Sequence, residues 1–154
     1  MTMIHDDATL SAHWMEHQIL GHIKEALRVT LDWKAPAVSM PRKLSSVRFT
    51  MKSFQRHLDR TMKLEEVGGY LSVVAEMKPN LYDRILVLVG DHDRFRWQLR
   101  EVMPRLEEVS QWNEDEFDDV CASVRALLDE VDLHDAAEIE LLQESLLMDE
   151  GGEG

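Results

Sequence analysis

The amino-acid sequence predicts an all-α protein that folds as an up-down-up-down antiparallel four-helix bundle. In four long segments, apolar residues recur at alternating steps of three and four, which is the stripe of an amphipathic helix. The period-two alternation of a half-buried strand is absent over any useful length. Short stretches that are polar or contain proline separate the segments, and such connections make consecutive helices antiparallel.

The first two helical segments are joined by a connection that Pro36 and Pro41 bracket. The stripe of the first segment is the looser one and contains Leu10, Trp14, His17, Leu20, Leu27 and Leu31. The stripe of the second segment is regular and contains Val47, Met51, Phe54, Leu58, Thr61, Glu65 and Gly68. The sequence Lys-Pro-Asn at 78–80 then predicts a turn into the third helix.

The third and fourth segments continue the alternation of steps. The third stripe contains Leu81, Ile85, Leu88, His92, Phe95, Leu99, Met103 and Leu106, and Pro104 should kink or end this helix. The polar stretch 111–116 is the last connection, and the fourth stripe contains Val120, Val124, Leu127, Val131, His134, Glu138, Leu141 and Ser145. We expect one bundle domain over residues 1–150 and a flexible acidic, glycine-containing tail at 151–154.

Composition excludes several classes of protein. The chain has 154 residues, 17 Lys and Arg against 30 Asp and Glu, and a net charge of −13, which disfavours nucleic acid and anionic membranes as partners. No apolar run is long enough to cross a bilayer, and Met1 to Asp7 does not read as a secretory signal, so a cytoplasmic location is expected. The single cysteine, Cys121, excludes an internal disulfide and a thiolate zinc cluster.

Five residues break the apolar stripes with side chains that can be charged: His17, Glu65, His92, His134 and Glu138. A lone carboxylate inside a bundle costs several kcal/mol unless it is neutralised or paired. Taken singly, each histidine can be an ordinary core histidine with a hydrogen-bond partner, and each glutamate can reach solvent at a bundle end. The five together call for a common explanation.

The spacing of these residues places them at one height. Residues in an antiparallel hairpin face each other when the turn lies midway between them. The midpoint of His17 and Glu65 is residue 41, that of Glu65 and His92 falls between 78 and 79, and that of His92 and His134 is residue 113. All three midpoints fall in predicted connections, so we expect a single polar layer near the middle of the bundle.

Imidazole and carboxylate groups without thiolate suit iron, manganese or zinc. His134 and Glu138 are four residues apart and point from one helix face into the same site. Bundle cores are where dinuclear carboxylate centres are built, but the Glu-x-x-His pair of the ferritin-like version is absent from this sequence. The order here is the reverse, His-x-x-x-Glu.

These features resemble the hemerythrin-like, or HHE cation-binding, domains. The matching pieces are Glu16-His17, Glu65-Glu66-Val-Gly-Gly-Tyr70, Asp91-His92 and His134-x-x-x-Glu138 followed by Leu141-Leu142. The ending Asp149-Glu-Gly-Gly is similar to one bacterial branch of the family. The resemblance covers nearly the whole chain, and it is the order and spacing of the pieces that carry it.

The resemblance implies a non-haem di-iron centre that binds oxygen, senses oxygen or redox state, or handles nitric oxide or peroxide. Carried over by position, His17, His92 and His134 would be terminal ligands, and Glu65 and Glu138 would be bridging carboxylates.

Two positions depart from the family pattern. Thr61 stands where the second helix of the family has a histidine, and Leu88 stands where oxygen carriers have a further histidine on the third helix. His57 and His13, one helical turn before Thr61 and His17, are additional candidate ligands. With this reduced ligand set, one metal or none are alternatives to a di-iron centre.

The sequence therefore favours a binding or sensing protein over an enzyme, with a small diatomic molecule or peroxide as its ligand. The alternative is a bundle without metal that acts by contact with a protein partner, and a homo-oligomer is also open. Four arginines on the third helix, Arg94, Arg96, Arg100 and Arg105, are expected to pair with acidic residues of neighbouring helices, with a docking surface for an acidic partner as the other interpretation.

Overall fold

The protein is all-helical, as predicted. The structure, a computed structural model, describes residues 2–34, 36–66 and 69–151, and of residues 2–10, 70 and 146–151 only the backbone. The described residues form no strand. The elements are α1 (Thr2–Leu31), α2 (Met40–Glu65), α3 (Tyr70–Met77), a 3-10 turn η1 (Pro79–Leu81), α4 (Tyr82–Glu108) and α5 (Glu114–Gly151). Residues 152–154, most of the predicted tail, lie outside the described residues, and Gly151 is the last residue of α5.

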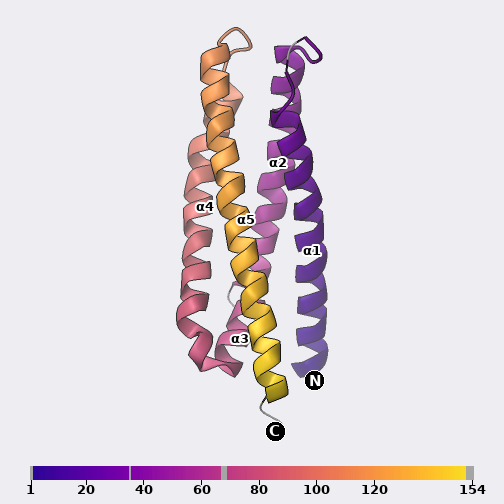
Figure 1. Ribbon diagram of the computed structural model, residues 1–154, viewed down its shortest axis with the longest axis vertical. Helices are drawn as coiled ribbons and strands as arrows, with labels where there is room; N and C mark the ends of the chain where they lie inside the picture. The colour runs from indigo at the N-terminus through magenta and orange to yellow at the C-terminus, as the bar shows by residue number, and fades with distance from the viewer. Residues whose placement is uncertain (1, 35, 67–68, 152–154) are drawn as a thin grey trace.

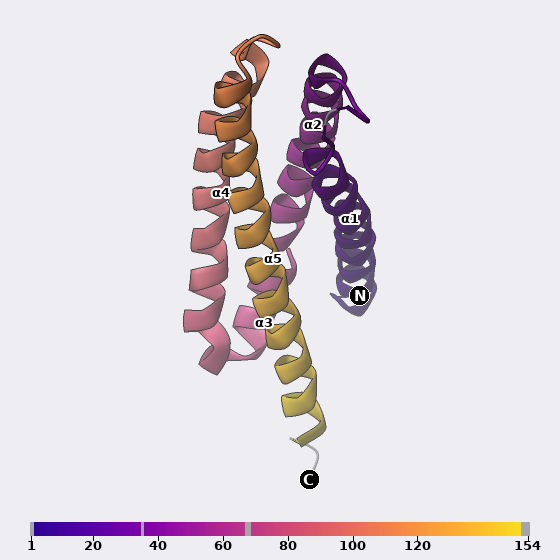
Figure 2. The same cartoon turned by 45° about the horizontal axis from the view of Figure 1, so that its top comes forward.

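The four long helices lie along the long axis of the molecule (Figure 1). Helices α1 and α2 lie side by side, and so do α4 and α5, in both views (Figure 2). The connections of these two pairs lie at the same end, whereas α3 lies at the other end and leads from α2 to α4.

Capping residues define two helix starts. Ser39 precedes α2 and its hydroxyl accepts the backbone N–H of Arg42 at 3.4 Å. Asn113 precedes α5 and its side-chain oxygen accepts the N–H of Glu116 at 3.1 Å. The first turn of α5 also carries three acidic residues, which interact favourably with the positive end of the helix dipole.

Two details differ from the sequence-based prediction. Helix α3 was not predicted, because eight residues are too few to show a helical period. It is held by Leu71 and Val74, which are buried against α4 and α5. Pro104 does not end the third long helix, since α4 continues to Glu108 and the ring of Pro104 is exposed.

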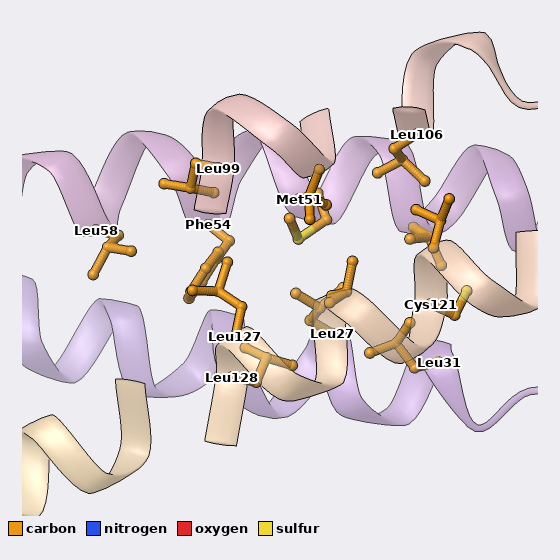
Figure 3. Packing of buried hydrophobic residues seen from close by; sticks show 14 of the residues in the cluster. Leu27, Leu31, Met51, Phe54, Leu58, Leu99, Leu106, Cys121, Leu127 and Leu128 are labelled. Carbon is orange, nitrogen blue, oxygen red and sulfur yellow. The ribbon is translucent and has the colours of Figure 1, made fainter. Parts of the chain in front are cut away.

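The hydrophobic core consists of two clusters. The larger cluster joins all four long helices and includes Leu27, Phe54, Leu99 and Leu127 (Figure 3). The smaller cluster surrounds α3 and contains Leu71, Val74, Leu81, Ile85, Leu88 and Leu141. On α4 and α5 the two clusters are separated by short polar stretches, which is where His92 and His134 lie.

Ion pairs between α1 and α5 fix the two helix pairs against each other. Lys24 contacts Asp132 at 2.7 Å and Asp135 at 2.5 Å, and Arg28 contacts Asp132 at 2.6 Å. Among the described residues, no helix is both long and apolar enough to span a membrane.

Candidate metal centre

Five buried side chains that can be charged meet between the two hydrophobic clusters. They come from four helices: His13 of α1, Glu65 of α2, His92 of α4, and His134 and Glu138 of α5. None of the five is more than 5 % exposed. Groups of this kind are buried only when they are paired, hydrogen-bonded or bound to a cation.

Glu65 lies at the centre of this layer, and its two oxygens face different partners. Its Oε1 lies 2.9 Å from Nε2 of His13. Its Oε2 lies 2.7 Å from Nε2 of His92 and 3.6 Å from Nε2 of His134. One carboxylate therefore connects an imidazole of α1 with the imidazoles of α4 and α5.

Glu138 has the same divided arrangement. Its Oε1 lies 2.8 Å from Nε2 of His13, and its Oε2 lies 3.4 Å from Nε2 of His134. Both oxygens are buried, so these two imidazoles are what the described residues offer to balance the charge of Glu138. Nε2 of His13 thus lies between two carboxylate oxygens, Oε1 of Glu65 at 2.9 Å and Oε1 of Glu138 at 2.8 Å, and has one proton to share between them.

These contacts form two overlapping donor sets. The first donor set is His13, Glu65 and Glu138, and the second donor set is Glu65, His92 and His134. In each set the donor atoms lie within 4.8 Å of one another. Two atoms at right angles on one metal ion, each about 2.1 Å from it, are about 3 Å apart, which is close to the separations found here.

The imidazoles of the second donor set have carboxylate partners on the far side of each ring. Nδ1 of His92 lies 3.1 Å from Glu66, and Nδ1 of His134 lies 2.9 Å from Asp91. When Nδ1–H donates to such a carboxylate, the lone pair of Nε2 points the other way, into the layer. Most metal-binding histidines have an outer partner of this kind, which fixes the tautomer and the ring orientation.

The charges in the layer are strongly coupled. Burial by itself would lower the pKa of His13, but hydrogen bonds to Glu138 and Glu65 outweigh it and raise the pKa to about 9. The pKa of His134 is raised to about 10 in the same way, against the effect of burial. Burial would raise the pKa of Glu65, yet its hydrogen bonds with the three histidines hold it well below the usual range. Positive charge beside the two carboxylates is therefore favoured, whether from protons or from a metal ion.

A third group of candidate ligands consists of His134, Asp135 and Glu138. Asp135 is already held by Lys24, whose Nζ lies 2.5 Å from its Oδ2. This ion pair makes Asp135 a weaker candidate ligand than Glu65.

Comparisons with known proteins leave the family open. No protein-family model matches the chain, and no curated protein or solved structure matches it either. The assignment of the site therefore rests on its own geometry.

The layer brings together four of the five residues that the sequence singled out, namely Glu65, His92, His134 and Glu138. The fifth, His17, belongs to neither donor set. Its ring stacks on Trp14 at 6.3 Å, and its Nδ1 is buried without a hydrogen-bond partner among the described residues.

His13, predicted only as an additional ligand, takes the place expected for His17. The reason lies in the connection between α1 and α2, which spans residues 32–39. The chain midpoint of His13 and Glu65 is residue 39, inside this connection, whereas the midpoint of His17 and Glu65 is residue 41, already inside α2.

The other residues near the layer have their own partners. His57 belongs to neither donor set, and its Nδ1 lies 2.9 Å from Glu16 of α1. The hydroxyl of Thr61 donates to the backbone carbonyl of His57 at 2.8 Å, so it is not directed at the layer as a ligand would be. Leu88 is part of the smaller hydrophobic cluster.

Sequence reasoning assigned no role to Glu66 and Asp91, the outer partners of His92 and His134. A signal was available, because each of them is the direct neighbour in sequence of a residue in the layer. On a helix, however, adjacent residues point in directions about 100° apart, so adjacency alone does not predict these contacts.

Proposed function

We propose that the chain is a hemerythrin-like up-down-up-down four-helix bundle whose buried layer binds two metal ions. Non-haem iron is the metal that we propose, and the function is to bind or sense oxygen or a related small oxidant. The observation that carries the proposal is the divided arrangement of Glu65 and Glu138, each with one oxygen beside His13 and the other beside His134.

This arrangement is what two adjacent metal ions require. A bridging carboxylate must offer one oxygen to each ion, and two such carboxylates from opposite helices hold the ions together. Glu138 supports this interpretation most strongly, because both of its oxygens are buried and each lies beside an imidazole of a different donor set.

The donor chemistry supports iron, with manganese and zinc as alternatives. The layer offers imidazole and carboxylate only, and the thiol of Cys121 is buried in the larger hydrophobic cluster. Each donor set has three residues, so an ion held there would have positions left for water or a small molecule. When bound, iron would supply reversible binding or reduction of such a molecule.

The surrounding residues prepare the layer for this role. Glu66 and Asp91 orient the imidazoles of His92 and His134, so that their Nε2 atoms face Glu65. The hydrophobic clusters on both sides shield the layer from water, which strengthens every electrostatic interaction in it.

The direct test is the variant Glu138→Gln, with Glu140→Gln as its control. Both substitutions remove one negative charge from α5, but Glu138 is buried in the layer and Glu140 is exposed. After anaerobic reconstitution with ferrous iron, Glu138→Gln should retain less iron than the wild type, while Glu140→Gln should retain the wild-type amount. Equal iron content in the two variants would contradict the proposal.

A second candidate function is a bundle without metal that acts by contact with a protein partner. Thr61 and Leu88 favour it, because neither can supply the imidazole that the family pattern has at these positions. Under this alternative, protons on His13 and His134 balance the two carboxylates permanently. The variant Thr61→His separates the two functions, since an added imidazole should increase metal retention only if the layer binds metal.

A further inference from the structure

A groove of about 490 Å³ lies between α2 and α4, outside the layer of buried His and Glu residues that forms the candidate metal centre. Four cationic side chains line it: Lys52 and Arg56 of α2, and Arg96 and Arg100 of α4. We call these four residues and the space between them the cationic groove. Such a concentration of positive charge is unexpected in a chain with 30 acidic and 17 basic residues.

The acidic residues nearby neutralise the cationic groove only in part, since Arg96 is paired with Glu66 but two of the other cations have no such partner among the described residues. Its one lining carboxylate, Asp59, pairs at 2.9 Å with Lys63, the residue one turn further along α2. Within the described part of the chain, Arg56 and Arg100 make no ion pair, and both are exposed. Lys52 has only a contact of 3.3 Å with Glu107, between two largely exposed side chains.

Other arginines of the same helix behave differently. Arg94 contacts Glu130 of α5 at 3.7 Å, and Arg105 contacts Asp119 of α5 at 2.7 Å, as the sequence predicted for all four arginines of this face. The prediction is wrong for Arg100, which lines the groove together with residues of α2 and makes no ion pair within the described residues. Arg56 and Arg100, which make no ion pair among the described residues, therefore line the same space from two helices, and this space is large enough for a ligand.

The shape and chemistry of this space favour a small molecule. Its volume lies within the range of about 300–1,000 Å³ that is typical of small-molecule sites. Guanidinium groups bind phosphate and carboxylate groups through paired hydrogen bonds. Met62 and Leu99 add an apolar surface, against which the body of an organic ligand can pack.

We propose that the cationic groove binds a small organic polyanion that carries at least two phosphate or carboxylate groups. Arg56 and Arg100, from opposite sides of the groove, contact the anionic groups, and Lys52 and Arg96 extend the positive field on either side. A long nucleic acid does not fit this site, since the net charge of −13 repels it.

Arg96 connects the cationic groove with the metal layer. Its guanidinium is bonded to Glu66, whose carboxylate also lies 3.1 Å from Nδ1 of His92. An anion that engages Arg96 competes with Glu66 and so loosens the outer partner of His92. This connection rests on the proposed metal function, whereas the anion site itself does not.

Anion binding is tested on the metal-free protein by isothermal titration calorimetry at low ionic strength. The probes are ATP for phosphate, citrate for carboxylate, and adenosine as an uncharged control. We expect saturable binding of ATP or citrate, none of adenosine, and an affinity that falls as salt is added. The double variant Arg56→Gln, Arg100→Gln should weaken binding about tenfold, since it removes the two exposed ion pairs that these arginines form with the bound anion.

The matched control is the double variant Lys34→Gln, Arg42→Gln, which removes two exposed positive charges away from the groove. It should bind the probes like the wild type. The proposal is overturned if neither ATP nor citrate binds saturably at millimolar concentrations, or if both double variants weaken binding equally. The proposal is also overturned if the groove binds an acidic peptide instead of a small anion. The probe for this outcome is a synthetic peptide with the acidic sequence of residues 144–154, which would bind while ATP and citrate do not.

The connection through Arg96 has a separate readout. In metal-loaded protein, saturating ATP should speed the release of metal to a chelator, and the Arg56→Gln, Arg100→Gln variant should lose this effect. An unchanged release rate at proven ATP saturation would refute the connection and leave the anion site standing. Failure of the proposed metal function leaves the binding experiment intact, because that experiment uses no metal.

Discussion

Replacing Asp91 by asparagine should weaken metal binding without disturbing the fold. Oδ2 of Asp91 lies 2.9 Å from Nδ1 of His134, and the opposite nitrogen of that ring faces Glu65 and Glu138. Asparagine preserves the size of the side chain and an oxygen that can accept the Nδ1 proton. It removes the negative charge that makes the imidazole a more basic, better ligand.

The size of the effect follows from linkage between binding and folding. Loss of an outer partner weakens metal binding about 10- to 100-fold. Metal at about 100 times its Kd stabilises the wild type by about 2.7 kcal/mol, and the variant would keep about 1.4 to 0.4 kcal/mol of this. For a chain of 154 residues, the lost stabilisation of about 1.3–2.3 kcal/mol corresponds to about 3–9 °C in Tm.

The assay is thermal unfolding of the variant with and without metal, at one fixed metal concentration. The control is Asp93→Asn, which removes the same charge from the same helix at a side chain that is 85 % exposed. The metal-dependent rise in Tm should be smaller for Asp91→Asn and unchanged for Asp93→Asn. The reasoning is refuted if both variants keep the full rise, or if Asp91→Asn loses as much Tm without metal as with it.

Two further predictions concern the same layer. Thr61→His places a bulkier ring at a position that is 2 % exposed, so it should destabilise the metal-free chain by about 1–3 kcal/mol yet increase metal retention; a variant with unchanged metal content would contradict this. The pKa values of His13 and His134 are raised from 6.5 to about 9 and about 10, because hydrogen bonds to Glu138 and Glu65 outweigh burial, which lowers them. The resulting stabilisation of the metal-free protein is therefore complete below pH 6.5 and is lost as pH rises through 9 to 10, and a Tm that stays flat or rises over this range would contradict it. Because metal must displace these protons, binding near pH 7 should release protons to an indicator dye, and metal affinity should increase with pH.

The sequence was informative about the fold wherever helices are long. Alternating steps of three and four identified α1, α2, α4 and α5, because a stripe of apolar residues is repeated over many turns. The same signal cannot reveal α3, which has only eight residues and is held mainly by contacts that Leu71 and Val74 make with distant parts of the chain.

The candidate site was predictable to the extent that charged residues interrupt those stripes. Glu65, His92, His134 and Glu138 all occupy stripe positions, and the structure buries them together. On α1, either His13 or His17 could face Glu65, depending on where the connection between α1 and α2 lies. The two alternatives differ by only two residues in the position of this connection. Sequence patterns do not locate helix ends that accurately, because the ends depend on capping and on tertiary packing.

The periodicity of the sequence does not predict the carboxylate partners on the outer side of the two imidazoles. Glu66 and Asp91 reach His92 and His134 through side-chain rotamers, and such contacts depend on the rotation of one helix relative to the next. The cationic groove also depends on the rotation of one helix relative to the next, since Arg56 of α2 and Arg100 of α4 must face one space.

The central claim is that two carboxylates bridge two metal ions in the buried layer. The most direct measurement is the metal content of protein purified without a metal-chelating tag, together with its absorption spectrum in air and after reduction. We predict about two iron ions per chain and near-ultraviolet bands that bleach on reduction, since each donor set would hold one ion. A chain that binds no metal, even after anaerobic reconstitution with ferrous iron, would contradict the claim.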